Sequence, residues 1–370
     1  MTPSSTSLGA VRRLPQSINN GSLILQDMLG VGAYGAVYRA IDTTTAEIRA
    51  VKCLHTSGLD SRQRAFQNHE ASLHALVSGH PNIATLHKVL EEEDCLYMVL
   101  DCGVEGDLFF TITERGGFVG NEVAIKSIFG QIASAVEHCH SLGVYHRDLK
   151  PENIIMFGST VKLVDFGLAT TEKTSSDFGC GSTFYLSPEC QGGYVESVKS
   201  YDSAANDVWS LGVILINLVF GRNPWKQACP RDDTFSAYVV NNNFLQTILP
   251  MSTELNEIIK SVFCLNPKKR ISLPELTRRV LECPCFTSPD FSAPPPPSTP
   301  TAVADAASPR TVTKTRATMI AAQTAAASIH LVKGGAPTTT TAIGSCMGSD
   351  SEQQQQGLGQ DSGVDFHSMA

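Results

Sequence analysis

The chain has 370 residues, 42% of them hydrophobic, and a formal net charge of −8 at pH 7. This composition allows a large buried core, and the lack of a basic excess argues against nucleic-acid binding through a charge field. No N-terminal stretch joins a basic region to an apolar run, so we expect no signal peptide. Eleven cysteines without paired Cys-x-x-Cys spacing indicate reduced thiols in a cytoplasmic or nuclear protein.

Residues 1–22 are rich in Ser, Thr, Asn and Gly, and we expect them to be flexible. A glycine-rich run follows them. It consists of Gly30, Val31, Gly32, Ala33, Tyr34, Gly35, Ala36 and Val37. The pattern alone is ambiguous, because dinucleotide-binding folds use it between a strand and a helix. Here alternating residues continue to position 41, residues 42–45 resemble a turn, and residues 48–52 start another strand. The sequence therefore predicts a β-hairpin that covers the phosphates. A Walker loop is excluded, because no Gly-Lys-Ser/Thr closes the run.

A helix and a strand are predicted next. Residues 62–76 carry Phe66, Leu73 and Leu76 at helical spacing, which places Glu70 in the middle of a helix. Residues 96–101 are an apolar strand that leads into a linker containing glycines and acids.

Two later motifs, YHRDLKPENI at 145–154 and DFG at 165–167, combine carboxylates, an amide and a lysine. Phosphoryl transfer from ATP to an alcohol needs an oriented hydroxyl and neutralised phosphate charge. Asp148 can accept the hydroxyl proton, and Lys150 can reach the transferred phosphate. Asn153 and Asp165 supply hard oxygen ligands that suit Mg²⁺. The two motifs therefore predict a phosphoryl-transfer site that uses ATP and Mg²⁺.

These motifs resemble the catalytic loop and the metal-binding motif of eukaryotic protein kinases. The resemblance implies an α+β, bilobal fold with a small, mostly antiparallel β N-lobe carrying one helix and a larger helical C-lobe. It places Lys52 where kinases carry the lysine that holds the α- and β-phosphates. It also implies that Glu70 pairs with Lys52, because an unpaired buried ammonium is costly. A solvated helix glutamate is the alternative for Glu70.

The resemblance extends to the adenine site. It implies that Leu100 is the gatekeeper behind the adenine and that backbone groups of Asp101 and Gly103 bind its edge. Asp107 would bind a ribose hydroxyl or a basic substrate side chain. The apolar residues expected around the purine are Val37, Ala50 and Ile155.

Residues 165–189 resemble a kinase activation segment that ends in Ser-Pro-Glu instead of the usual Ala-Pro-Glu. The resemblance implies that Glu189 pairs with Arg270 and that Asp207 braces the backbone of the catalytic loop.

The usual activating phosphothreonine is missing from this segment. Phe178 occupies its position, although Arg147, which normally clasps such a phosphate, is present. We expect that Asp177 or a phosphorylated Ser176 partly replaces the phosphate, or that packing alone holds the segment.

Residues near Asp148 indicate the substrate class. Lys150 in the catalytic loop and Ser182 resemble those of Ser/Thr kinases, in which the serine contacts both Asp148 and Lys150. Asp107 and Glu152 occupy positions that bind arginine in basophilic kinases, so we expect basic residues upstream of the target. The expected partners are proteins with Ser or Thr acceptors, without nucleic acid or membrane, and the catalytic domain is expected to be monomeric.

Longer strings, at 178–193 and 221–226, resemble the fungal Ser/Thr kinases that include meiosis-repressing and nutrient-responsive members. This implies a role in growth, nutrient or meiotic signalling. A pseudokinase would lack one of Lys52, Asp148, Asn153 or Asp165, and none is missing. A small-molecule kinase would lack the Ser-Pro-Glu motif and the Asp207 motif.

We predict a kinase domain at 23–286, with an N-lobe at 23–102 and a C-lobe at 103–286. Its most apolar window, 208–220, is too short to span a bilayer, and we expect a buried helix there. Residues 287–370 are poor in Leu, Ile, Val and Phe and rich in Pro, Ser, Thr and Ala, which predicts a disordered tail. This tail is either a phosphorylation or docking region or a passive extension.

Overall fold

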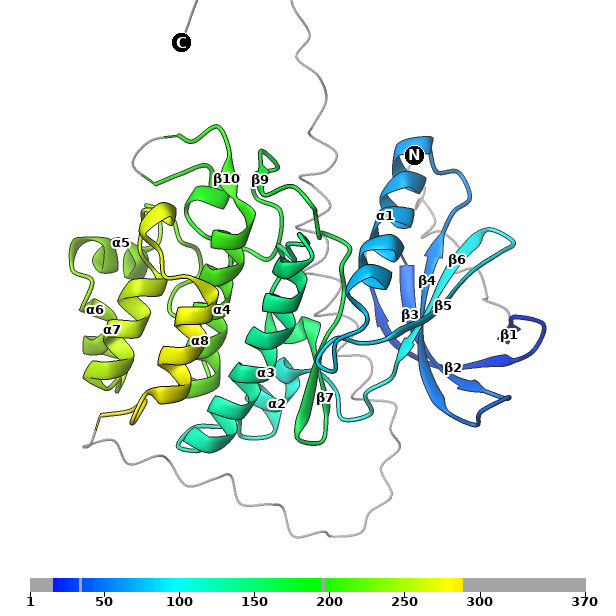
Figure 1. The fold of residues 1–370 in the computed structure, drawn as a ribbon, viewed down its shortest axis with the longest axis horizontal. Coiled ribbons are helices and arrows are strands. Elements are labelled where there is room, and N and C mark those ends of the chain that lie inside the picture. The colour runs from blue at the N-terminus through cyan, green and yellow to red at the C-terminus, as the bar shows by residue number, and fades with distance from the viewer. Residues whose placement is uncertain (1–15, 33–34, 195–196, 289–370) are drawn as a thin grey trace, which may run out of the picture. The chain divides into compact units, whose positions relative to one another are not determined.

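A computed structural model describes residues 16–32, 35–194 and 197–288 of the chain. Ala33 and Tyr34 of the glycine-rich run lie outside these residues, as does nearly all of the tail that we predicted to be disordered. The described residues form the expected α+β arrangement of a strand-rich N-lobe and a helical C-lobe (Figure 1).

The N-lobe is built on an antiparallel six-stranded sheet with the order β1-β2-β3-β4-β6-β5. Its strands are β1 (Ser17–Ile18), β2 (Leu23–Val31), β3 (Gly35–Asp42), β4 (Ile48–His55), β5 (Leu86–Glu92) and β6 (Cys95–Asp101). Strands β2 and β3 pair from Leu23↔Asp42 to Val31↔Ala36, which confirms the predicted hairpin. The sheet starts earlier than we expected, because β1 lies within the range 1–22. Ile18 is buried in the hydrophobic cluster of this sheet, and this burial fixes the segment.

One helix, α1 (Ser61–Val77), packs with the sheet. Asp60 and Gln63 form a capping box, in which each side chain accepts a hydrogen bond from the other's backbone N–H, and this box defines the start of α1. The buried face of the helix includes Gln67, Glu70 and His74, which recur at helical spacing. This register directs Glu70 inward and rules out its solvated alternative.

The C-lobe is mainly helical. Its helices are α2 (Leu108–Glu114), α3 (Glu122–Ser141), α4 (Ser203–Phe220), α5 (Asp233–Val240), α6 (Phe244–Ile248), α7 (Thr253–Val262) and α8 (Leu273–Glu282), with short 3₁₀ helices at Pro151–Asn153, Glu189–Gln191 and Pro267–Lys269. Two small antiparallel sheets pair β7 (Ile154–Phe157) with β8 (Thr160–Leu163) and β9 (Thr174–Ser175) with β10 (Tyr201–Asp202).

The central helix of the C-lobe is α4. It begins at Ser203, before the window predicted from sequence, and Asp202 caps it by accepting a hydrogen bond from the Ala205 N–H. Among the described residues it alone has the length and mean hydropathy (1.4) of a membrane span, and 83% of it is buried inside the protein. A core helix of a folded domain has the same properties.

Backbone hydrogen bonds join the two lobes. The Leu163 N–H donates to the Asn82 carbonyl (2.8 Å), and the Ala84 N–H donates to the Leu163 carbonyl (3.0 Å). Because β8 ends at Leu163, these bonds fix the strand that leads into Asp165 against the N-lobe.

Candidate active site

The loop that carries Asp148 is held by helix α4. Asp207, fully buried, accepts hydrogen bonds from the backbone N–H groups of His146 (2.9 Å) and Arg147 (2.8 Å). Arg147 has φ of 65°, a left-handed conformation that costs energy for a residue other than glycine. The predicted brace is therefore present, and it stabilises a strained backbone immediately before Asp148.

Asp148 is at the centre of a hydrogen-bonded group of four residues. The Lys150 ammonium donates to Asp148 Oδ2 (2.6 Å) and to Ser182 Oγ (2.9 Å). The Ser182 N–H donates to Asp148 Oδ1 (2.9 Å), and the Asn153 amide donates to the Asp148 carbonyl (2.9 Å). Ser182 thus contacts both Asp148 and Lys150, as the sequence predicted. Burial lowers the pKa of Lys150, but the neighbouring carboxylate of Asp148 outweighs burial and raises it.

Lys52 binds two carboxylates, one in each lobe. Its ammonium bonds to Glu70 Oε1 and, at 2.9 Å, to Asp165 Oδ1. Burial lowers the pKa of Lys52, but the charges of Asp165 and then of Glu70 raise it above its usual value. The Lys52 ammonium in turn holds the pKa of Asp165 well below its usual range, against the effect of burial. Lys52 and Asp165 are therefore a charged pair, and the Asp165 side chain keeps 45% of its surface exposed.

The side chain after Asp165 points into the core. Phe166 is fully buried, with its ring 4.8 Å from the His74 ring and 5.0 Å from the His146 ring, measured between centroids. Asp165 itself has φ of 65°. The buried phenyl ring anchors this strained turn and directs the carboxylate toward Lys52.

The residues predicted to surround adenine meet where the lobes join. Val37 is paired with Lys52 and Ala50 with Leu100 across adjacent strands. Gly103 lies so close to Ile155 that a Cβ atom on Gly103 would stand 2.3 Å from Ile155 Cγ2. The structure thus pairs Ala50 with Leu100 and brings Gly103 against Ile155, and this second close approach requires a glycine at position 103.

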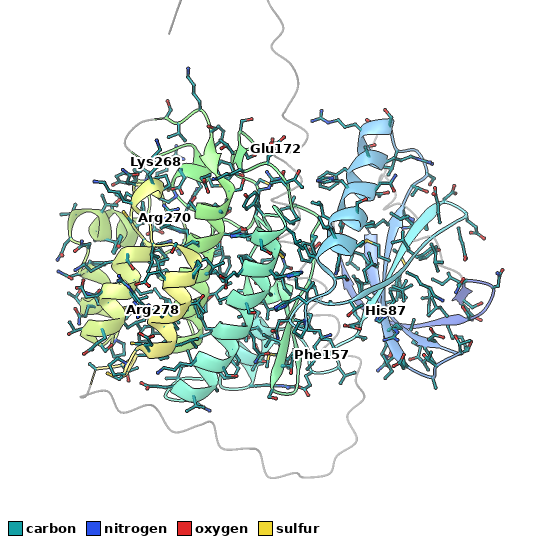
Figure 2. All side chains as sticks on the ribbon, viewed as in Figure 1. His87, Phe157, Glu172, Lys268, Arg270 and Arg278 are labelled. Atoms are coloured by element: carbon teal, nitrogen blue, oxygen red, sulfur yellow. The ribbon has the colours of Figure 1, made fainter. Side chains whose placement is uncertain are left out.

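Asp101 has a role that the sequence did not indicate. Its carboxylate accepts hydrogen bonds from Lys162 Nζ (2.7 Å) and from the Thr85 N–H (3.0 Å), and it contacts His87 Nε2 (2.7 Å). Figure 2 labels His87 on the N-lobe. Burial would raise the pKa of Asp101, but these hydrogen bonds hold it well below its usual range. Since Lys162 lies on β8, the side chain of Asp101 ties the lobes together while its backbone remains at the predicted adenine edge.

Two acidic residues predicted to bind substrate lie at the start of α2 and in the catalytic loop. Asp107 is buried and caps α2 by accepting a hydrogen bond from the Phe110 N–H (2.7 Å). Glu152 has a carboxylate oxygen, Oε2, that is buried and has no hydrogen-bond partner among the described residues. Burial raises the pKa of Glu152, with further contributions from the charges of Asp148 and Asp107, while Lys150 opposes them. The Lys150 charge thus acts on this carboxylate, but its Oε2 keeps a free hydrogen-bonding position within the described structure.

The donor set suits Mg²⁺ bound together with phosphates. Asn153 uses its amide nitrogen in bonds to Asp148, which leaves its amide oxygen for a ligand role, and the Asp165 side chain keeps 45% of its surface exposed. The Val164 N–H donates to the Asn153 carbonyl (2.9 Å), which holds the backbone of Asn153 against the residue before Asp165. No group of three His, Cys, Asp or Glu side chains suited to a metal occurs within the described residues. Mg²⁺ in nucleotide sites takes one or two protein ligands and completes its shell with phosphate oxygens and water. Asn153 and Asp165 fit that requirement.

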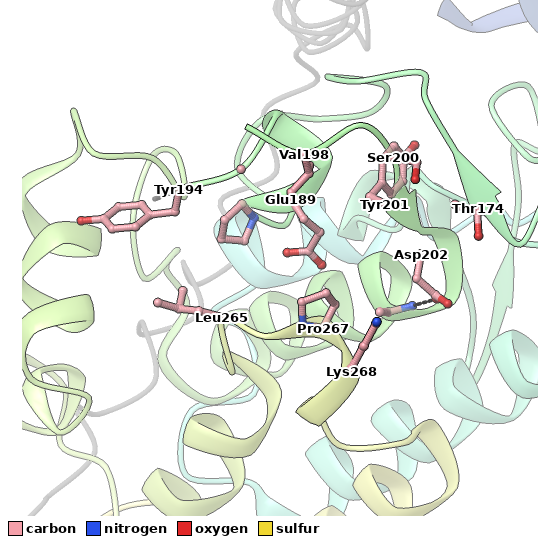
Figure 3. A pocket seen from close by; sticks show the side chains of 13 residues that line it. Thr174, Glu189, Tyr194, Val198, Ser200, Tyr201, Asp202, Leu265, Pro267 and Lys268 are labelled. Carbon is pink, nitrogen blue, oxygen red and sulfur yellow. Dashed lines mark hydrogen bonds between the residues drawn. The ribbon is translucent and has the colours of Figure 1, made fainter. Parts of the chain in front are cut away.

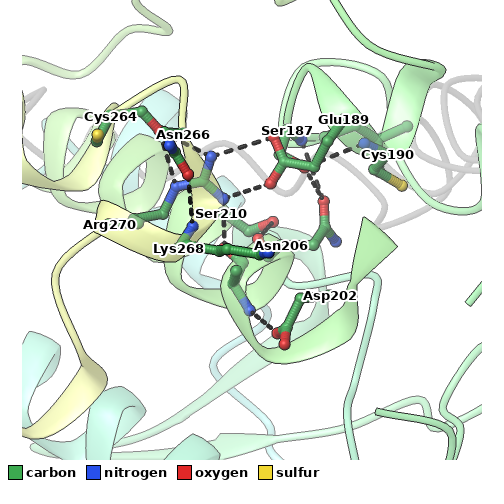
Figure 4. Close-up of polar contacts among 12 residues, drawn as sticks. Ser187, Glu189, Cys190, Asp202, Asn206, Ser210, Cys264, Asn266, Lys268 and Arg270 are labelled. Carbon is green, nitrogen blue, oxygen red and sulfur yellow. Dashed lines mark hydrogen bonds and ion pairs between the residues drawn. The ribbon is translucent and has the colours of Figure 1, made fainter. Parts of the chain in front are cut away.

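The predicted link between Glu189 and Arg270 is present (Figure 4). Arg270 Nη2 donates to Glu189 Oε2 (3.1 Å) and to the Cys264 carbonyl (2.9 Å). Both charged side chains are almost fully buried, at 1% exposure for Arg270 and 6% for Glu189. Nearby, Asn206 on α4 accepts hydrogen bonds from the backbone N–H and the hydroxyl of Ser187. These bonds fix the end of the activation segment to the C-lobe.

A cavity of about 510 Å³ lies elsewhere, between the end of the activation segment and the start of α4 (Figure 3). Tyr194, Val198, Leu265 and Pro267 line it together with Glu189. Two carboxylates line this cavity, and both are engaged elsewhere: Glu189 pairs with Arg270, and Asp202 accepts a hydrogen bond from the Ala205 N–H as the cap of α4. We place the reaction at Asp148 and Asp165, where the paired charges converge.

Arg147 contacts the activation segment without a phosphate. Its guanidinium donates to Asp177 Oδ2 (3.2 Å), to Ser175 Oγ (3.1 Å) and to the Leu168 carbonyl (2.7 Å). Ser176 is exposed, whereas Ser175 is buried. Of the groups expected to replace the phosphate, the Asp177 carboxylate occupies the position beside Arg147.

Comparison with known proteins agrees with this geometry. Residues 24–281 match the family model described as protein kinase domain. The chain is 51% identical over 282 residues to the "Negative regulator of sexual conjugation and meiosis" of Schizosaccharomyces pombe, an alignment that covers 71% of this chain and 60% of that protein. In Saccharomyces cerevisiae it is 33% identical over 333 residues to the serine/threonine-protein kinase VHS1 (73% of this chain, 72% of that protein). It is also 38% identical over 231 residues to the serine/threonine-protein kinase SKS1 (59% of this chain, 46% of that protein).

The chain thus spans 60% of the length of the S. pombe relative and less than half of SKS1. The match covers both lobes and every motif described above, and the kinase relatives in S. cerevisiae are of the serine/threonine class. The chain therefore belongs to the protein kinase family, and within it to the serine/threonine protein kinases.

Proposed function

We propose that this chain transfers the γ-phosphate of ATP to Ser or Thr of protein substrates that carry basic residues upstream of the acceptor. The observation that carries this proposal is the group around Asp148. Its carboxylate is bound by Lys150, Asn153 and Ser182. Asp165, which pairs with Lys52, raises the pKa of Lys150 by its charge, so the two groups act on each other.

The side chains have separable tasks. Asp148 accepts the proton of the substrate hydroxyl, and Lys150 donates hydrogen bonds to the oxygens of the transferred phosphate. Lys52, held by Glu70, binds the α- and β-phosphates. Asn153 and Asp165 would hold Mg²⁺, which supplies charge neutralisation on the phosphate oxygens when it is bound.

The preference for basic residues is supported by Glu152. Its Oε2 is buried and finds no hydrogen-bond partner in the part of the chain that the structure describes, and an unpaired buried carboxylate is costly. An arginine of the substrate would supply a charge-assisted, bidentate bond at that position, next to the acceptor that Asp148 orients.

The cellular role is proposed from the relatives. The S. pombe relative is named for the negative regulation of conjugation and meiosis. We propose that the present chain acts in meiotic or nutrient signalling in the cytoplasm or the nucleus, with a monomeric catalytic domain.

Phosphate transfer to paired peptides tests the biochemical proposal. The peptides share one Ser acceptor and differ only in an upstream Arg or Ala, and wild type should prefer the Arg peptide about 10- to 100-fold in kcat/KM. Asp148→Asn should abolish transfer to both peptides. Glu152→Gln should retain transfer to the Ala peptide and lose most of the preference, whereas Glu114→Gln, an exposed carboxylate on α2, should leave the preference unchanged.

Each part of the proposal can fail separately. Equal turnover by wild type and Asp148→Asn would remove the role of Asp148. Equal kcat/KM for the two peptides in wild type would remove the basic preference and leave the kinase assignment intact.

A further inference from the structure

The sequence beyond the described residues contains a basic segment rich in threonine. Only four Lys or Arg residues follow residue 288, and three of them, Arg310, Lys314 and Arg316, lie within seven positions. We propose that the kinase domain phosphorylates Thr318 of its own chain, with Arg316 and Lys314 bound at the acidic subsite formed by Glu152 and Asp107. This inference rests on the proposed function.

Charge complementarity is the first argument. Among the described residues the buried Oε2 of Glu152 has no hydrogen-bond partner, and Asp107 forms an antiparallel bridge with Ile155, three residues after Glu152. Glu152 lies in the loop that carries Asp148, four residues after it, so a cation bound there can belong to the same peptide as the acceptor hydroxyl. Arg316 and Lys314 lie two and four residues before Thr318. Alternate residues of an extended peptide point to the same side, so both cations can face the subsite.

The residue after the acceptor selects Thr318 over the other threonines of the segment. Ser182 contacts Asp148 and Lys150, and two residues further along the chain Phe184 keeps 38% of its surface exposed. In this proposal the exposed Phe184 side chain receives the residue that follows the acceptor, so an apolar residue is favoured there. Met319 follows Thr318, whereas Lys314 follows Thr313. Thr318 alone in this segment combines two upstream cations with an apolar successor.

The tail is long enough to reach the site of its own domain. The described chain ends at Ser288, where its N–H donates to the Pro250 carbonyl (3.0 Å). The roughly 30 residues between Ser288 and Thr318 span up to about 100 Å when extended. A domain of this size has a radius of gyration of about 18 Å. The linker therefore permits transfer within one molecule.

The chemical step balances with ATP as the donor. The Thr318 Oγ1 forms a bond to the γ-phosphorus as the bond from that phosphorus to the β-γ bridging oxygen breaks, and ADP leaves with this electron pair. The hydroxyl proton passes to the Asp148 carboxylate. No reactant beyond those of the proposed activity is needed.

Time-resolved phosphate mapping on the full chain tests the proposal. The protein is stripped of phosphate, freed of phosphatase, and supplied with ATP and Mg²⁺, and occupancy of Thr318 is followed by mass spectrometry. Thr318 should be the first tail residue modified. Its first-order rate constant should stay constant over a roughly hundredfold dilution of the enzyme, because an intramolecular step does not depend on enzyme concentration. The double variant Lys314→Ala/Arg316→Ala should slow the step about tenfold or more.

Two controls separate this inference from the proposed function. Lys333→Ala removes a tail charge outside the segment and should leave the rate at Thr318 unchanged, and Asp148→Asn should give no phosphate at all. The arginine peptide is assayed in the same preparations. If the arginine peptide is phosphorylated while Thr318 stays unmodified, the intramolecular proposal alone is overturned. The same conclusion follows if the rate constant for Thr318 rises with enzyme concentration. Absence of both peptide and tail phosphorylation overturns the proposed function itself.

Discussion

The Phe178 ring packs against the Tyr201 ring, with 5.9 Å between their centroids and 47° between their planes. Phe178 joins a hydrophobic cluster with Leu186, Cys190 and Tyr201, which connects the activation segment to β10. An aromatic contact thus occupies the position where related kinases place a phosphate. Because the Asp177 carboxylate already faces Arg147, the segment has both apolar and ionic links to the C-lobe.

This packing predicts that the enzyme is active without phosphate on the activation segment. Protein treated with phosphatase should keep full peptide kinase activity, and Ser176→Ala should match wild type. Phe178→Ala should remove the aromatic contact, lower stability by about 1–3 kcal/mol and reduce kcat/KM, because the segment no longer holds Ser182 in place. Activity that appears only after Ser176 is phosphorylated would contradict this prediction.

Motifs made the catalytic group predictable, because their residues are close in sequence. Asp148, Lys150 and Asn153 lie in one short loop, so their roles follow from spacing alone. The α+β arrangement followed for the same reason, since strand alternation around the glycine-rich run and helical spacing around Glu70 are local signals. The structure confirmed the predicted contacts from Lys52 to Glu70 and from Glu189 to Arg270.

Other features depend on residues that are far apart in the chain, and distances between such residues cannot be read from sequence patterns. The contacts of the Asp101 side chain with Lys162 and His87 are of this kind. Ile18 is another case, because its burial depends on strands later in the chain, although its own neighbours are polar. Asp107 caps α2, a local signal that could have been recognised from its position just before an apolar helix.

Gly103 is predicted to set the fit of ATP. A methyl group at this position would stand 2.3 Å from Ile155 Cγ2 and 2.8 Å from the Met156 carbonyl oxygen, so the linker must move. Gly103→Ala should raise KM for ATP about tenfold while KM for the peptide changes little, as steady-state kinetics at varied ATP would show. Gly79→Ala is the control, since a Cβ there meets nothing within 4 Å. Unchanged KM for ATP in Gly103→Ala would mean that the linker does not contact the nucleotide.

The buried pair of Glu189 and Arg270 is predicted to be essential for stability. Removing one partner leaves an uncompensated buried charge, so Glu189→Gln or Arg270→Met should cost about 3–5 kcal/mol in urea unfolding. Arg278 pairs with Glu275 on the surface of α8, and Glu275→Gln should leave the unfolding midpoint unchanged because water screens that pair. Similar losses in the buried and the exposed variants would refute the argument from burial.

His74 couples the catalytic core to pH. It is 1% exposed, its Nε2 lies 2.7 Å from the Ala84 carbonyl oxygen, and its ring contacts Phe166. Burial, the largest influence, lowers the pKa of His74 from 6.5 to about 4, although the bond to Ala84 opposes it. His74 is therefore neutral in the folded protein at pH 7, and its Nε2–H donates to the carbonyl.

The sign of the pH dependence follows from this lowered pKa. Between pH 6.5 and about 4, His74 is protonated in the unfolded chain but remains neutral in the folded protein. The free energy of unfolding should therefore decrease as the pH is lowered through this window. At pH 5 the loss due to His74 alone should be about 2 kcal/mol relative to pH 7. Urea unfolding at both pH values measures it, and His74→Gln, which can still donate to Ala84, should lose about that much less than wild type. His69→Gln, an exposed histidine on the same helix, should follow wild type. If His74→Gln and wild type lose equal stability, another buried group controls the acid response.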